Sequence, residues 1–238
     1  MPASLEAAWG RRGRPPKGPK PGLSLPRIVD AAVGVAASEG LAAVSMGRVA
    51  AALGASPMSL YRYVAAKDEL LALMLDAASG PPPDLPDVGW RDGLSNWAQA
   101  VRVALRRHPW ALHIPMSGPP ITPNQIAWLE LALRCLRDTG LAEGEKLATV
   151  LLLSGFVWRE SNLAVDIEAA VASDNKWHNV AMNYGRALAK LIDEERFPAV
   201  SAMIGSGIFD EVGDPDYEFD FGLERILDGI EVLVHARG

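Results

Sequence analysis

Residues 41–70 read LAAVSMGRVAAALGASPMSLYRYVAAKDEL, and this stretch decides the fold of the N-terminal part of the chain. Ser45 is a plausible N-cap for a short helix, and Gly54 lies in a tight turn after it. Ser56 then precedes a second short helix whose first residue is Pro57. Serine is a favoured N-cap and proline a favoured first helical residue. Two short helices joined by a glycine-containing turn predict a helix-turn-helix.

The residue types around the turn predict how these two helices pack. Gly54 is expected where a side chain would obstruct the reversal of the chain, and Ala51 and Ala52 are expected to let the helices approach closely. The second helix is expected to project these side chains outward: Met58, Ser59, Tyr61, Arg62 and Tyr63. Such an exposed face suits a DNA major groove. The alternative is that Tyr61 and Met58 pack on their neighbours, and that Arg62 and Lys67 are solvated surface residues.

Two further helices frame this motif. One is expected to begin after Ser24 and to end at Gly40, because Ile28 and its neighbours recur at helical spacing. The other opens at Lys67 or Asp68, with apolar residues at the positions expected to face a core. Residues 23–79 are therefore predicted to form a helix-turn-helix domain.

The first 22 residues are predicted to be a basic, flexible arm. The stretch 11–22 is rich in proline, glycine and basic residues and has no apolar period, so it cannot fold alone. Arg14 and Lys17 are candidate contacts to a DNA backbone or minor groove. The alternative is an ordinary solvated tail.

The distribution of charge agrees with DNA as a partner, although the chain as a whole carries a formal charge of −6. Residues 1–80 hold nine Lys/Arg against six Asp/Glu. Local charge governs a phosphate-binding face, so an acidic total does not exclude one.

The remainder, residues 87–238, is predicted to be a larger helical domain after the proline-rich breaker 80–86. Helices are expected at about 90–107, 110–116, 122–139, 143–164, 175–195 and 219–236. The one at 122–139 is expected to start with a capping box, Thr-Pro-Asn-Gln. There is no alternating strand pattern and no internal repeat. The predicted fold is all-α.

Composition excludes several function classes. The single cysteine, Cys135, rules out an internal disulfide framework, and a reduced, cytoplasmic location is expected. No apolar run reaches the roughly 20 residues of a membrane span. No metal or cofactor is expected, because His113 and His178 have no ligand partners at helical spacing. An enzyme is not expected, since catalytic motifs are absent; a helical binding or interaction protein without DNA remains the alternative.

Aromatic residues concentrate in the second region and suggest a small-molecule cavity. Each tryptophan could equally be plain core. If a cavity exists, it would hold an apolar or aromatic effector, and its candidate lining residues are Trp97, Trp110, His113, Met116, Trp128, Phe156, Asn162, Trp177 and His178.

The segment from Val44 to Val64, followed by Lys67-Asp68-Glu69-Leu70, resembles the TetR family of bacterial repressors. The resemblance covers about residues 24–76, and the rest is similar to the tetracycline-repressor-type C-terminal domain in length and helix order. It implies DNA contacts from Ser45 and Arg48, from Ser56, Pro57, Met58 and Ser59 at the start of the recognition helix, from Tyr61 with Arg62 and Tyr63, and from Lys67.

Two departures from the family pattern matter. Ala66 stands where a serine cap is usual, so the helix opening at Lys67 is expected to fray more. Pro57 and Met58 replace a more usual polar residue and glycine, so base preference cannot be carried over.

The resemblance also implies a homodimer and a ligand-responsive regulator. Two apolar helices would form a four-helix bundle with the second subunit, through Leu151, Gly155, Trp158, Leu223, Ile226, Ile230 and Val234. The alternative is that both helices are buried within one subunit. The implied function is repression at a near-palindromic double-stranded DNA operator, relieved by a small molecule; activation in place of repression stays open.

Overall fold

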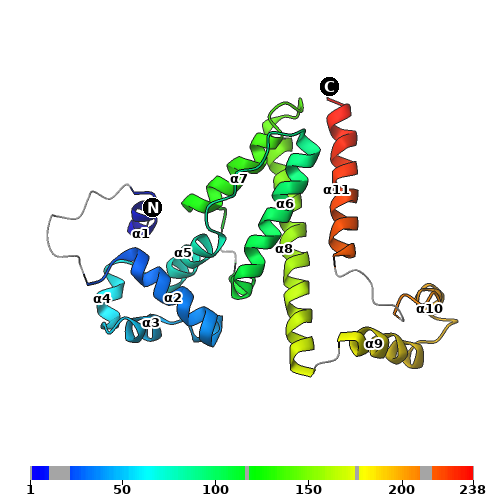
Figure 1. The fold of residues 1–238 in the computed structure, drawn as a ribbon, viewed down its shortest axis with the longest axis horizontal. Helices are drawn as coiled ribbons and strands as arrows, with labels where there is room; N and C mark the ends of the chain where they lie inside the picture. The colour runs from blue at the N-terminus through cyan, green and yellow to red at the C-terminus, as the bar shows by residue number, and fades with distance from the viewer. Residues whose placement is uncertain (1, 11–21, 116–117, 175–176, 210–215, 238) are drawn as a thin grey trace. The chain divides into compact units, whose positions relative to one another are not determined.

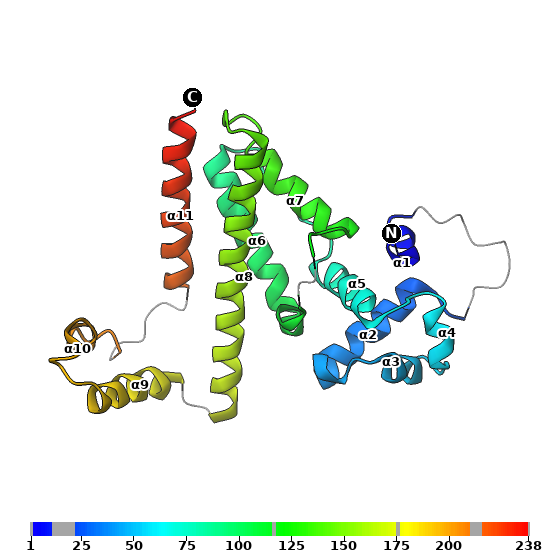
Figure 2. The same cartoon turned by 180° about the vertical axis from the view of Figure 1, so that it is seen from behind.

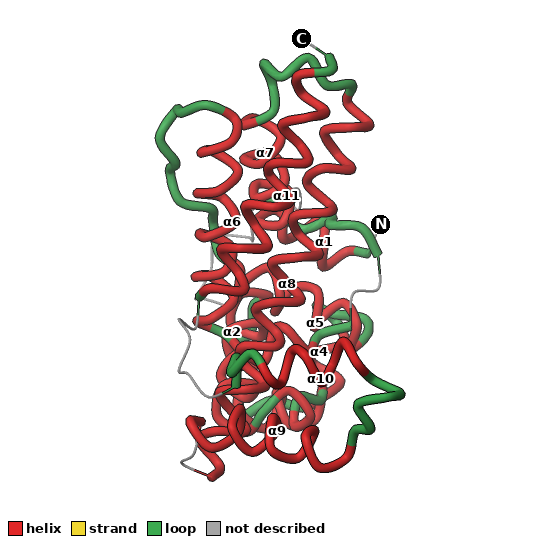
Figure 3. Tube along the Cα trace, turned by 90° about the vertical axis from the view of Figure 1, so that its right-hand side faces the viewer, coloured by secondary structure: helices red, strands yellow, loops and turns green. Residues whose placement is uncertain are grey.

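The computed structural model describes residues 2–10, 22–115, 118–174, 177–209 and 216–237, without the side chains of 169–183. This part of the chain is helical and contains no strand (Figure 1; Figure 3). The prediction of an all-α fold is confirmed. The elements are α1 (Ala3–Ala8), α2 (Leu25–Glu39), η1 (Leu41–Ala43), α3 (Met46–Ala52), α4 (Pro57–Tyr61), α5 (Lys67–Ser79), α6 (Trp90–Arg107), η2 (Pro109–His113), α7 (Pro123–Cys135), α8 (Glu143–Asp174), α9 (Trp177–Leu191), α10 (Pro198–Gly205) and α11 (Tyr217–His235).

Helices α2 to α5 surround one apolar core, which we call the helix-turn-helix core. Ser24 caps α2, as predicted, and accepts a hydrogen bond from the backbone N–H of Arg27. Ser45 caps α3 in the same way, through Arg48. The largest fully buried side chains of this core come from α2 to α5, their connecting loops included: Ile28, Val44, Val49, Leu60, Val64, Leu70 and Met74.

The turn between α3 and α4 depends on the backbone of Gly54. Its φ is +63°, a left-handed conformation that side chains disfavour, while a Cβ at this position would meet nothing within 4 Å. The expectation that a side chain would obstruct the turn is therefore wrong, and the backbone angle is the reason for glycine. Ala51 and Ala52 are exposed, and Ala50 is the alanine that packs inside.

The segment 80–86, where a domain boundary is predicted, lies inside one compact unit of the structure. Two compact units divide the chain as Met1–Asn162 with Ile226–Gly238, and Leu163–Arg225. The first unit extends beyond α5 because η2 packs against η1 and α5. Trp110, Ala111 and Ile114 belong to the helix-turn-helix core. This segment, predicted as a short helix, is a 3₁₀ helix.

Asp76 of α5 caps the start of α7. One oxygen of its carboxylate accepts the backbone N–H of Asn124 at 2.8 Å and that of Gln125 at 3.2 Å. Thr122 occupies the N-cap position, but its hydroxyl donates to the Gln125 side chain at 2.8 Å and caps no backbone group. The predicted capping box is thus replaced by a carboxylate from a helix 48 residues earlier in the chain.

The N-terminal residues differ from the predicted arm. Ala3–Ala8 form helix α1, and Leu5 is buried in the helix-turn-helix core. Burial of the Leu5 side chain in this core stabilises the short helix. The prediction is therefore wrong for residues 3–8, while the basic stretch 11–21 lies outside the described residues.

The second unit contains α9 and α10, which pack against each other (Figure 2). The ring of Phe209 lies edge-on to that of Tyr184, with centroids 5.5 Å apart. Gly185 makes room for it, because a Cβ there would come within 2.8 Å of Phe209. Helix α10 is not among the predicted helices, and α8 continues to Asp174, past its predicted end.

We expect Asp76→Ala to lower the free energy of unfolding by about 2 kcal/mol, because the start of α7 loses its cap. Urea denaturation of the full chain, followed by circular dichroism, measures this loss. Asp84→Ala removes an exposed carboxylate from the loop before α6 and is the matched control. An equal loss of stability in both variants would contradict the capping role.

Candidate nucleic-acid interface

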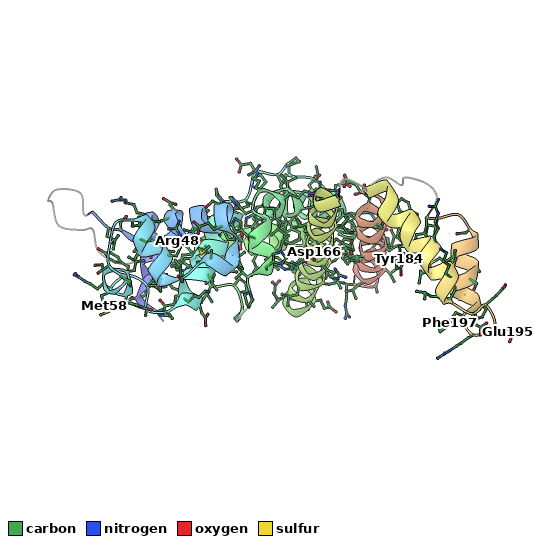
Figure 4. All side chains as sticks on the ribbon, turned by 90° about the horizontal axis from the view of Figure 1, so that it is seen from below. Arg48, Met58, Asp166, Tyr184, Glu195 and Phe197 are labelled. Atoms are coloured by element: carbon green, nitrogen blue, oxygen red, sulfur yellow. The ribbon has the colours of Figure 1, made fainter. Side chains whose placement is uncertain are left out.

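The short helix α4 presents one buried and one exposed side. Leu60 and the following Val64 are fully buried and fix it on the helix-turn-helix core. Met58 is 74 % exposed and points away from the ribbon (Figure 4). Pro57, Tyr61 and Arg62 are exposed as well. The structure therefore places these predicted contact residues on an accessible surface.

Two serines at the start of α4 interact with each other. Ser56 holds the N-cap position without accepting a backbone hydrogen bond, so its predicted role as a side-chain cap is wrong. Its hydroxyl lies 2.9 Å from that of Ser59. Each hydroxyl keeps further hydrogen-bonding capacity, which a phosphate or base edge could use.

Tyr63 is not on the outward face. Its ring is half-buried against the helix-turn-helix core, and its hydroxyl donates to the Leu23 carbonyl oxygen at 3.1 Å. The prediction that this side chain projects outward is wrong. Helix α4 ends at Tyr61, so its outward face does not continue to position 63. Tyr63 instead ties the chain before α2 to the segment that follows α4.

Arg48 on α3 is exposed and already carries an ion-pair partner. Its guanidinium group pairs with Glu39 at the end of α2, with Nε 3.0 Å from one carboxylate oxygen and a second, shorter contact. The hydrogen bond from Arg48 lowers the pKa of the Glu39 carboxyl group, against an opposing effect of burial. A DNA phosphate at Arg48, as the sequence predicts, would have to share or replace this carboxylate.

Lys67 is the first residue of α5 and is exposed. Ala66, at the N-cap, supplies no side-chain hydrogen bond, as the sequence predicts. Glu69, which has no predicted role, accepts the backbone N–H of Ala65 at 3.1 Å. A glutamate at the third helical position is the signal that could have found it. Arg14 and Lys17 lie outside the described residues.

Two tryptophans predicted to line a cavity are parts of the core. The indole N–H of Trp97 donates to the backbone oxygen of Trp128 at 3.0 Å, and that of Trp128 donates to the oxygen of Gly80 at 3.0 Å. Both side chains are buried. They stabilise the junction of α6, α7 and the end of α5, and their contact with a ligand stays a prediction.

Trp110 differs from these two. Its indole N–H and the hydroxyl of Ser161 on α8 are buried without a hydrogen-bond partner in the described part of the chain. The neighbouring Asn162 donates to the Leu112 carbonyl oxygen at 3.5 Å, so α8 and η2 meet at this height. Phe156 is half-buried, whereas His113 is exposed.

Three candidate cavity residues are not among the residues and side chains that the structure describes. Met116 and the side chains of Trp177 and His178 lie outside the described residues. A surface hollow of about 270 Å³ lies between the loop before α6 and the end of α7, and none of the predicted residues lines it.

Among the helices that the structure describes, none combines the length and the apolar character that a bilayer span needs.

The predicted dimer residues fall into two groups. On α8, Leu151 is 58 % exposed, Gly155 is exposed, and Trp158 packs on the helix-turn-helix core. On α11, Leu223 and Ile230 are buried within the subunit, so their assignment to the dimer interface is wrong and the alternative, burial within one subunit, holds for them. Ile226 and Val234 are half-buried, while Gly229 and Val232 are exposed. The inward stripe of α11 follows the 3.6-residue period through Leu223, Leu227 and Ile230.

Two family models match the chain. The model described as bacterial regulatory proteins, tetR family, matches residues 28–74. The model described as tetracyclin repressor-like, C-terminal domain, matches residues 82–234. The first spans the helix-turn-helix and the second spans α6 to α11.

Known relatives agree with these models. The HTH-type transcriptional repressor DrrR1 of Streptomyces coeruleorubidus is 38 % identical over 242 residues, covering 98 % of this chain and 87 % of the relative. The crystal structure of apo ActR from Streptomyces coelicolor is 28 % identical with a TM-score of 0.72, covering 89 % of this chain and 98 % of ActR. The structure of ActR in complex with actinorhodin has the same identity and coverage and a TM-score of 0.73. With both parts matched, the chain belongs to the TetR family of bacterial regulatory proteins.

Proposed function

We propose that this chain is a ligand-responsive transcriptional repressor that binds an operator through α4. The observation that carries the proposal is that Leu60 and Val64 fix α4 from inside while Met58, Tyr61 and Arg62 face solvent. A short helix held firmly with its outer side chains accessible can enter a major groove. The relative DrrR1 is itself named a transcriptional repressor.

The contacts to DNA divide by role. Ser56, Pro57, Met58 and Ser59 stand at the start of the recognition helix, where side chains reach base edges. Tyr61 and Arg62 flank them and suit phosphate. Lys67 adds an ammonium group to the positive end of the α5 dipole, which favours a phosphate at that point. Ser45, Arg48 and the basic residues Arg14 and Lys17 add backbone contacts in this proposal, while Tyr63 acts by holding α4.

A homodimer would supply two recognition helices for a near-palindromic operator, about 34 Å apart. The support is the outer face of α8, where Leu147, Leu151 and Leu152 are exposed around Gly155. On α11, Gly229 and Val232 offer a second exposed, small or apolar surface. Exposed apolar patches of this kind mark protein interfaces.

The effector is proposed to be a small, largely apolar or aromatic molecule bound by the helical second region. The similar protein ActR has been crystallised in complex with actinorhodin. In this chain, Trp110 and Ser161 offer a buried donor and a buried hydroxyl without partners among the described residues. An unpaired buried donor costs about 1–3 kcal/mol, which an acceptor oxygen on the ligand would recover. Binding of the ligand then weakens binding of the operator, and the reverse holds equally. Both events are proposed to take place in the cytoplasm.

We expect Lys67→Ala to weaken binding to all DNA sequences alike and to reduce the salt slope of binding by about one, because one phosphate contact is lost. Tyr61→Phe should weaken binding about fivefold at fixed salt, through loss of one hydrogen bond. Mobility-shift titrations on a fragment selected by the protein from random genomic DNA measure both. Lys190→Ala removes an exposed lysine from α9 and should change neither quantity. Unchanged affinity in the Lys67 and Tyr61 variants would reject their roles.

We expect Leu151→Glu to convert the dimer to monomers, because it places a charge in the centre of the exposed face of α8. Sedimentation equilibrium at micromolar concentration measures the assembly state. Val103→Glu introduces the same charge at another exposed apolar position, on α6, and should leave the dimer intact. A Leu151→Glu variant that remains dimeric would show that α8 does not form the interface.

A further inference from the structure

The N-terminus of α5 lacks the cap that its position requires. The first backbone N–H groups of a helix have no partner within the helix. Ala66 holds the N-cap position with extended backbone angles, φ −145° and ψ 159°, but an alanine side chain accepts nothing. Lys67, the proposed phosphate contact, follows directly. A fraying first turn would move that lysine and weaken the helix end as an anion site.

Glu69 stabilises this turn from its third position. Its Oε2 accepts the backbone N–H of Ala65 at 3.1 Å. The same oxygen accepts the hydroxyl hydrogen of Ser4 at 2.7 Å. A carboxylate acceptor makes both bonds stronger than neutral ones. The glutamate is thereby held between its own turn and a residue 65 positions earlier in the chain.

Ser4 is fixed independently of Glu69. It lies on α1, is 2 % exposed, and is followed by Leu5, which is buried in the helix-turn-helix core. At the other end of α1, the indole N–H of Trp9 donates to the carbonyl oxygen of Ile121 at 2.8 Å. Helix α1 also packs against α5 and α2 (Figure 2). The hydroxyl of Ser4 is therefore presented to Glu69 from a docked element.

We infer that Ser4 is a positioning residue for DNA binding, whose hydroxyl holds Glu69 in place at the start of a helix that has no side-chain N-cap. Its hydroxyl fixes the Glu69 carboxylate, which in turn binds the backbone N–H of Ala65 and stabilises the first turn of α5. This turn directs Lys67 and the N-terminus of the helix toward a phosphate. Ser4 itself is buried and does not touch DNA. The inference rests on the proposed function, in which the start of α5 contacts the DNA backbone.

The decisive experiment restores the missing cap at its usual place. Ser4→Ala should weaken binding to a selected genomic fragment about fivefold, through loss of the hydrogen bond that holds Glu69. Adding Ala66→Ser should return the affinity to that of the unaltered chain, because Ala66 is exposed and already has the backbone angles of an N-cap. Mobility-shift titration of the full chain at fixed salt measures each affinity, and thermal unfolding is recorded in parallel.

Two controls separate positioning from folding. Leu5→Ala weakens the docking of α1, so it should lower both DNA affinity and the unfolding temperature, and Ala66→Ser should restore the affinity alone. Lys67→Ala reports whether the start of α5 contacts DNA at all. Normal binding by Ser4→Ala, beside weakened binding by Lys67→Ala, overturns the role of Ser4 and leaves the proposed function standing. Weakened binding that Ala66→Ser does not restore also overturns it, because Ser4 would then act only through stability.

Discussion

The structure depends on burial of the apolar side of a helix too short to fold alone. Helix α4 has five residues, and one or two turns of helix are unstable in water without tertiary packing. Leu60 and Val64 provide that packing in the helix-turn-helix core, where both are fully buried. Because Leu60 and Val64 fix α4 from its buried side, the residues on its exposed side are free to contact DNA in the proposed function. Tyr63 adds to this anchoring, because its ring packs on the same core and its hydroxyl donates to the Leu23 carbonyl oxygen.

The second constraint is that the DNA-binding helices share their core with the region that follows them. Trp110 and Ile114 of η2 pack in the helix-turn-helix core, and Asp76 of α5 caps α7. A ligand that moves η2 or the start of α7 must therefore repack or uncap part of the DNA-binding elements. This shared packing gives a physical basis for coupling between effector and operator.

Two carboxylates hold groups of the proposed DNA-binding surface in place without DNA. Arg48 is paired with Glu39, and the turn that carries Lys67 is held by Glu69. Carboxylates beside a phosphate-binding surface reduce its net charge, yet they also fix the geometry of the groups that bind. The acidic total of the chain and a DNA-binding face are compatible because basic residues outnumber acidic ones locally, within residues 1–80.

The amino-acid sequence by itself determined the features that depend on neighbours along the chain: the helical periods, the caps at Ser24 and Ser45, and the glycine turn at position 54. Only the tertiary structure decided which partners meet across long separations. The cap of α7 by Asp76, the contact of Ser4 with Glu69, and the burial of Leu223 and Ile230 are of this kind. Periodicity shows that a residue lies on an apolar stripe, but the surface which that stripe meets depends on how distant segments pack.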